Sequence, residues 1–289
     1  MVLTEGIAAG ILAAACWGVA DFLAKKAVDR VGSLRTLFWV QSIGLLALLP
    51  ALAFVPLGIP SNGSAFGLAL LIGVVNVTTY LIFYRGFEKG KLSVISPIAG
   101  SAGAVTVVLG LALLGERLLP VQGAGVLLAL IGVPLVSIDM KEIRGKALAS
   151  LAAGVPEAVF SMLGWGAMWF LVAFVEGWAG WLFVILAMRA VTVTCAGAYS
   201  GMGKEGVALG KKGKGLWGVI AAAGILDAVG FASLGFAMTT EFASIVTPIA
   251  SAYPAVTVIL ALVLLRERLL ATQLLGIVLV LVGVAALSA

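Results

Sequence analysis

The chain has 289 residues, of which 62% are hydrophobic and only 11% are charged, and its mean hydropathy is +1.20. Soluble globular domains are about half apolar and about a quarter charged, so this composition excludes a soluble protein. The net charge of +5 is spread over short loops and forms no basic domain, so we expect no nucleic-acid partner.

Apolar segments long enough to cross a bilayer follow one another along the whole chain. A bilayer core about 30 Å thick needs about 20 apolar residues per spanning helix. Ten such segments leave no room for a soluble domain; they cover residues 6–24, 34–55, 64–84, 92–114, 121–139, 150–174, 178–200, 216–238, 243–265 and 271–288. The sequence therefore predicts an all-α integral membrane protein with ten transmembrane helices.

Basic residues gather on one side of the predicted membrane. The loops after spans 1, 3, 5, 7 and 9 hold all of them except Arg117, on the opposite side, and Arg189, inside span 7. The positive-inside rule makes the basic side cytoplasmic. We therefore expect both termini to lie outside.

The sequence contains an internal repeat. SPIAGSAGAVTVVLGLALLGERLL begins at Ser96, and the similar TPIASAYPAVTVILALVLLRERLL begins at Thr247, an offset of 151. Earlier in each half, Trp17-Gly18 aligns with Trp165-Gly166 at an offset of 148. The sequence thus predicts a single transmembrane bundle of two five-helix repeats, residues 1–144 and 145–289.

Five spans per repeat have a geometric consequence. Because five is odd, the second repeat enters the membrane from the other side, which gives an inverted-topology (5+5) repeat. Such repeats are typical of transporters, whose halves exchange conformations around a central site. Duplication as a mere route to a larger membrane protein is the alternative interpretation.

Spans 4 and 9 each contain a proline near their start. Pro97 and Pro248 each remove one backbone hydrogen bond, and Pro254 adds a second proline to span 9 beside Tyr253. A carbonyl freed in this way must face protein or a cavity. We expect bent or broken helices that act as hinges around a cavity; a lipid-facing kink is the alternative. The Glu-Arg pairs at 116–117 and 267–268 are interpreted as structural turns.

Ionisable residues inside apolar spans are costly and usually face the bundle interior. Glu157, Arg189 and Asp227 are three such residues, whereas Asp21 and Glu176 lie closer to predicted span ends and are interpreted as reaching the interface. Burial raises a carboxyl pKa towards neutrality. Glu157 and Asp227 are therefore candidates for proton coupling.

The alignment of the two repeats supports a functional role for two polar positions. Asp227 aligns with Asn76, and Arg189 aligns with Gln41, so both halves place a polar group at these two depths. Arg189 either binds a substrate carboxylate or forms an internal salt bridge with Glu157 or Asp227; the sequence leaves both open.

Aromatic residues complete the predicted cavity. Tyr80 and Tyr84 follow Asn76 at four-residue intervals and share its helix face. Trp17, Trp165 and Trp169 lie well inside their spans, where they either line a pocket that can bind a cation or pack the core. The predicted cavity residues are Trp17, Gln41, Asn76, Tyr80, Tyr84, Trp165, Trp169, Arg189, Asp227 and Tyr253.

The sequence offers no signature of catalysis or of a metal site. Both cysteines, Cys16 and Cys195, lie in apolar spans, and the chain has no histidine. Neither HExxH nor Gly-x-Ser-x-Gly occurs. We expect no cofactor, no metal and no enzymatic activity.

The pattern resembles the drug/metabolite transporter superfamily, and specifically its ten-span EamA family. The resemblance rests on the duplicated Trp-Gly, the Ser/Thr-Pro of spans 4 and 9, and Glu-Arg-Leu followed by Gln122-x-x-Gly125 and Gln273-x-x-Gly276. It implies a secondary carrier, commonly an exporter of amino acids or similar metabolites in a prokaryotic inner membrane. It also implies that spans 1–4 and 6–9 enclose the pathway and that spans 5 and 10 buttress it.

The predicted orientation departs from this family. Its termini are usually cytoplasmic, whereas the charges here predict that both termini lie outside. We expect a monomeric carrier of a small molecule in the lipid bilayer, with protons as the candidate coupling ion. A flippase of lysolipids or lipid-linked sugars with the same fold is the alternative.

Overall fold

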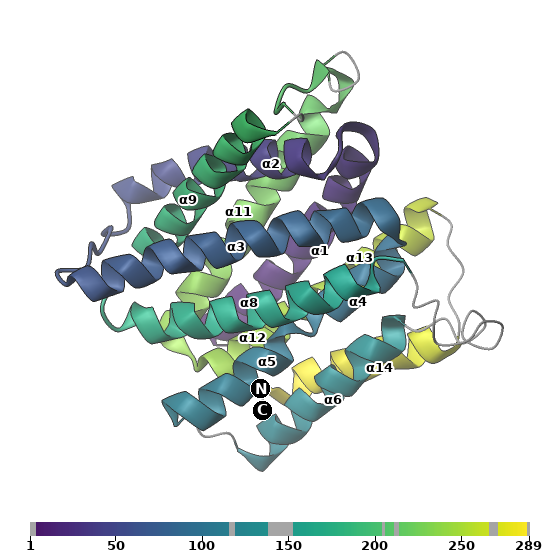
Figure 1. Ribbon diagram of the computed structural model, residues 1–289. Coiled ribbons are helices and arrows are strands. Elements are labelled where there is room, and N and C mark those ends of the chain that lie inside the picture. Colours follow the sequence, from purple (N-terminus) through teal and green to yellow (C-terminus); the bar gives the residue numbers. More distant parts are fainter. Residues whose placement is uncertain are drawn as a thin grey trace.

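The computed structural model describes residues 4–115, 119–137, 153–203, 206–210, 214–265 and 271–287, and all regular secondary structure in them is helical (Figure 1). The first half contains α1 (Glu5–Val31), α2 (Ser33–Leu48), the 3-10 helix η1 (Leu49–Ala53), α3 (Gly63–Lys89), α4 (Leu92–Gly100), α5 (Ala102–Leu109), the π-helical η2 (Gly110–Leu114) and α6 (Pro120–Ser137). The second half contains α8 (Val155–Glu176), α9 (Trp181–Met202), the 3-10 helix η4 (Lys214–Leu216), α11 (Trp217–Thr240), α12 (Ala243–Ala250), α13 (Tyr253–Leu265) and α14 (Ala271–Leu287).

The described residues contain eight helical stretches that are long and apolar enough to cross a membrane. They correspond to all the predicted spans except the fifth and the tenth. At those two positions lie α6 and α14, which are 18 and 17 residues long. The all-helical fold is confirmed, whereas the count of ten spans stays a prediction.

The predicted fourth and ninth spans are both interrupted helices. α4 gives way to α5 at Ser101, and α12 gives way to α13 after Ala250. Pro97 and Pro248 lie inside α4 and α12, because a helix can continue past a proline when only one hydrogen bond is lost. Each break therefore comes a few residues after its proline.

The two breaks meet each other in the bundle. The backbone N–H of Gly103, in α5, donates to Ser251 Oγ at 3.1 Å. Gly100 lies so close to α13 that a Cβ atom there would be 2.4 Å from Cγ of Pro254. Pro254 itself is the second residue of α13. A backbone N–H in the first turn has no acceptor within the helix, so a proline there costs no hydrogen bond.

The helix contacts of one half have counterparts in the other. α1 packs on α11 as α8 packs on α3, and α4 packs on α13 as α12 packs on α5. α6 and α14 pack on each other, and Figure 1 shows them side by side at one edge of the bundle. The other helices thus surround the centre without them.

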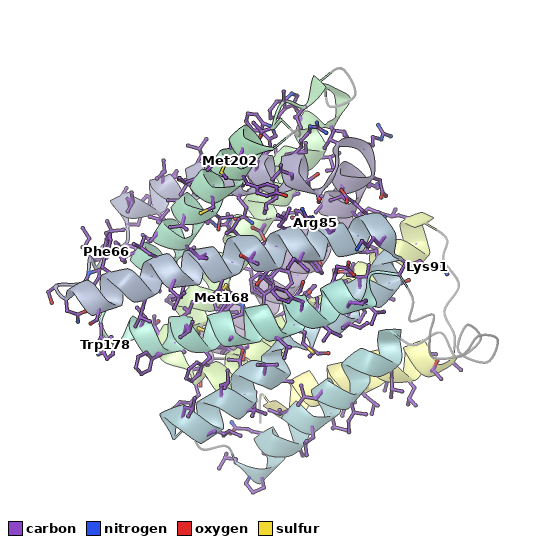
Figure 2. All side chains as sticks on the ribbon, in the orientation of Figure 1. Phe66, Arg85, Lys91, Met168, Trp178 and Met202 are labelled. Carbon is purple, nitrogen blue, oxygen red and sulfur yellow. The ribbon has the colours of Figure 1, made fainter. Side chains whose placement is uncertain are left out.

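The first helices of the two halves run in opposite directions. Lys25, near the end of α1, donates to the carbonyl of Phe87 at 2.8 Å, and Glu157, at the start of α8, pairs with Lys89. The end of α1 and the start of α8 therefore lie at the same end of α3. Figure 2 shows Arg85 and Lys91 towards this end of the bundle and Phe66 and Trp178 towards the other.

Several features of the sequence fall outside the described residues. They are the Glu-Arg pairs at 116–117 and 267–268, the boundary between the predicted repeats at 144–145, and the loop lysines and arginines Lys141, Arg144, Lys146, Lys204, Lys211, Lys212, Arg266 and Arg268.

Candidate functional site

A cavity lies beside the crossing of the two broken helices. Its walls come from both halves; the described lining residues are Trp17, Asp21, Tyr80, Trp165, Trp169, Phe231, Ser251 and Tyr253. Its volume is about 40 Å³. The cavity is therefore small in this structure.

Aromatic rings form most of the cavity wall. The ring of Trp17 lies 5.8 Å from that of Trp169, 5.2 Å from Phe231 and 6.2 Å from Tyr253, between ring centres. Phe231 also stacks on Trp169 at 5.2 Å. These spacings are those of aromatic pairs in contact, so the rings hold one another in place. Of the two interpretations of the tryptophans, their place in the wall supports the pocket.

The repeat explains why tryptophans meet here. Trp17 and Trp165 occupy equivalent positions of α1 and α8, and both line the cavity from opposite halves. Their indole N–H groups are buried and find no acceptor in the part of the chain that the structure describes. Buried donors usually have a partner, so these two N–H groups are exceptions. Trp17 Nε1 packs against α11, where a Cβ atom at Gly230 would lie 2.6 Å from it.

Asp21 supplies the cavity's carboxylate. It lies in the middle of α1, one helical turn after Trp17, and its Oδ2 accepts a hydrogen bond from Ser96 Oγ at 3.0 Å. The carbonyl of Ser96 accepts from Tyr253 OH at 3.3 Å. α4 is thereby joined to α1 and to α13 around the cavity. Asp21 thus lines the cavity, and its position relative to the membrane interface stays a prediction.

A buried ion pair lies next to the cavity. Arg189 Nη2 is 2.8 Å from Asp227 Oδ2, and the two side chains are 0% and 6% exposed. Arg189 Nη1 donates to Gln41 Oε1 at 2.9 Å, and Gln41 Nε2 lies 3.3 Å from the same carboxylate oxygen. Tyr80 OH donates to Asp227 Oδ1 at 2.6 Å. The predicted alternative of an internal salt bridge is the one found, with Asp227 as the partner.

The polar side chains at equivalent positions of the two halves have different partners. In α3, Asn76 Nδ2 donates to Thr192 Oγ1 of α9 at 3.0 Å. The residue of α2 equivalent to Thr192 is Gly44, where a Cβ atom would lie 2.4 Å from Arg189 Nη1. The missing side chain at Gly44 makes the space that the guanidinium fills.

Five of the ten predicted cavity residues line the cavity in this structure; these are Trp17, Tyr80, Trp165, Trp169 and Tyr253. Gln41, Asn76, Arg189 and Asp227 lie in the polar pairs beside it. Tyr84 packs against Tyr80, Phe83 and Phe87. Of the predicted hinges, Pro248 contacts the region of Gly103, and Pro254 lies against Gly100.

Glu157 lies away from the site. It is in the first turn of α8, where it pairs with Lys89, and its side chain is 17% exposed. The predicted span began at residue 150, whereas α8 begins at Val155, so the sequence placed Glu157 too deep. Its partner lies 68 residues earlier in the chain, which no local pattern can reveal.

The sequence did hold a signal for Asp21. At the offset of 148 that aligns Trp17 with Trp165, Asp21 aligns with Trp169, which was already a cavity candidate. Ser251, the other missed residue with a polar side chain, aligns with Gly100 at the offset of 151. At these two positions the repeats therefore differ, whereas Trp17 and Trp165 are the same residue in both.

Comparison with known proteins identifies the family. Residues 4–138 and 152–289 each match the EamA-like transporter family, so the family unit occurs twice and covers nearly the whole chain. The chain belongs to the EamA-like transporter family. Membership in this transporter family, together with the apolar helices, makes the chain an integral membrane protein.

The chain is also similar to two known proteins. An uncharacterized protein of Methanocaldococcus jannaschii is 30% identical over 137 residues, which are 47% of this EamA-like chain and 99% of that protein. A solved crystal structure of a protein, 17% identical, covers 97% of this chain and 95% of its own with a TM-score of 0.76. The archaeal relative has the length of one family unit, and the crystal structure shares the fold.

Proposed function

We propose that this EamA-like protein is a secondary transporter that exports small organic metabolites, amino acids among them, by alternating access. The observation that supports the proposal best is the small cavity beside the crossing of the two broken helices, with walls from both family units. Inverted repeats around a central site are the usual architecture of such carriers.

The proposed alternating access requires a movement, and we place it at the crossing of the two broken helices. The cavity is small, and we propose that α4, α5, α12 and α13 separate when a substrate enters. Helix ends absorb changes of backbone angle more easily than helix interiors do, because fewer hydrogen bonds hold them. We propose that the segments around Ser101 and Ser251 are the hinges.

The experiment is uptake of radiolabelled amino acids and related metabolites into proteoliposomes, with and without a pH gradient. The wild type is compared with Asp21→Asn, Asp227→Asn and Glu157→Gln. We expect saturable uptake that Asp21→Asn reduces strongly, because this carboxylate lines the cavity. Glu157→Gln serves as the matched carboxylate outside the cavity and is expected to keep most of the activity.

One result would count against this function, and a second would count against a coupling role for these carboxylates. If no metabolite is taken up while a fluorescent lysolipid changes leaflet in the same vesicles, the protein is a flippase. If a pH gradient stimulates uptake equally in the wild type and in all three carboxyl variants, none of these carboxylates couples transport to protons.

A further inference from the structure

We propose that the central cavity binds a small organic cation, with the Asp21 carboxylate as its counter-ion and the surrounding aromatic rings as its cage. The proposal names a substrate class for the proposed transporter, and its transport part rests on that function. Its binding part stands by itself.

Asp21 is the one charged residue among the described residues that line the cavity. None of the ion pairs found between described residues involves it, and its hydrogen bond comes from the neutral hydroxyl of Ser96. Asp21 is partly buried, and a carboxylate with reduced access to water is stabilised by an opposite charge. The cavity therefore favours a positively charged guest.

The aromatic rings reinforce this preference. Trp17, Trp169, Phe231 and Tyr253 are packed in contact around the same space that Asp21 faces. The faces of aromatic rings attract cations, and tryptophan does so most strongly. A quaternary or protonated amine could thus contact the carboxylate and several ring faces together.

A carboxylate on the guest would meet no cationic side chain among the described residues that line the cavity. Arg189 is fully buried, is not among the described lining residues, and is engaged by Gln41 and Asp227. Its guanidinium lies over the ring of Phe231, 4.9 Å from the ring centre, and Phe231 lines the cavity. The buried indole N–H groups are neutral donors suited to a hydroxyl or carbonyl oxygen. The site therefore favours a cation over an amino-acid zwitterion.

Three probes of one shape test this preference. Choline is a permanent cation, glycine betaine carries the same trimethylammonium group with a carboxylate, and 3,3-dimethylbutan-1-ol is the neutral carbon analogue of choline. Binding to the detergent-purified full chain is followed by quenching of tryptophan fluorescence. We expect choline to bind at least about tenfold more tightly than either of the others.

Variants of one helix assign the effect to Asp21. Asp21→Asn is expected to weaken choline binding at least about tenfold and to leave the neutral analogue unchanged. Asp21→Glu keeps the charge and is expected to restore much of the choline binding. Asp29→Asn is the matched control, because Asp29 belongs to α1 but pairs with Lys25 at a side chain that is 50% exposed. Equal elution volumes in gel filtration show that the variants are folded.

The outcomes separate the two proposals. Equal binding of the three probes, or choline binding that survives Asp21→Asn, overturns the cation site; metabolite uptake by the same preparation then leaves the transporter proposal standing. If choline binds through Asp21 but proteoliposomes accumulate none of the cations or metabolites tested, the cation site stands and the transport function fails.

Discussion

At the scale of single residues, the buried pair of Arg189 and Asp227 organises the centre of the protein. Four described helices supply the network, because Gln41 lies in α2, Tyr80 in α3, Arg189 in α9 and Asp227 in α11. Tyr80 also lines the cavity. The network therefore joins the packing of both halves to the wall of the proposed binding site.

Removing one partner of this pair leaves the other charge buried and uncompensated. We expect Arg189→Gln or Asp227→Asn to lower the free energy of unfolding by about 3–5 kcal/mol. The double variant should lose less than the sum of the two, because neither charge remains. Asp29→Asn, which breaks an exposed pair, should cost at most about 1 kcal/mol. Denaturant titration in mixed micelles measures these differences; strictly additive losses would show that the pair is not coupled.

At the scale of helices, the breaks in α4–α5 and α12–α13 bring the two halves together beside the site. Ser251 reaches the backbone of Gly103 across the crossing, and Gly100 lies against Pro254. Small residues at these points let the broken helices approach closely, as is common between helices in membranes.

A methyl group at the crossing should disturb both packing and movement. In Gly100→Ala, the new Cβ would lie 2.4 Å from Pro254 Cγ, so α4 and α13 have to move apart. Overpacking of this kind costs about 1–3 kcal/mol, and we expect lower thermal stability and slower uptake. Gly67→Ala in α3 is the control, because a Cβ there meets nothing within 4 Å. Equal effects of the two substitutions on uptake would contradict the role given to the crossing.

At the scale of the whole molecule, the surface matches a lipid environment. Large apolar side chains are exposed on many of its helices, for example Val263 at 68%, Leu46 at 63% and Leu127 at 61%. Exposed apolar area on this scale is rare in soluble monomers. The end of the bundle that holds Arg85 and Lys91 faces the cytoplasm in the orientation that the charges predict.

This orientation can be tested with single cysteines. In a chain without Cys16 and Cys195, Ser61→Cys lies between α2 and α3, and Gly206→Cys lies between α9 and η4. We expect a membrane-impermeant maleimide added to intact cells to label position 61 and not position 206. The reverse pattern would place both termini in the cytoplasm and show that the charge rule fails here.

The sequence alone determined the helical membrane class, the positions of eight long apolar helices, the two interrupted segments and the duplication. These features depend on local hydropathy, on prolines and on similarity within the chain, which need no knowledge of how helices pack. The equivalence of Gln41 with Arg189 and of Asn76 with Asp227 also pointed to the polar centre.

The tertiary structure decided which polar groups meet and how deep they lie. Lys25 and Lys26 end the apolar segment near residue 24, but α1 continues to Val31. Asp21 therefore lies ten residues from the helix end, about 15 Å inside it. The partners of Arg189 and Glu157 depend on helix rotation and crossing, which hydropathy does not fix. That is why the carboxylate of the cavity is Asp21, whereas Glu157 pairs with Lys89.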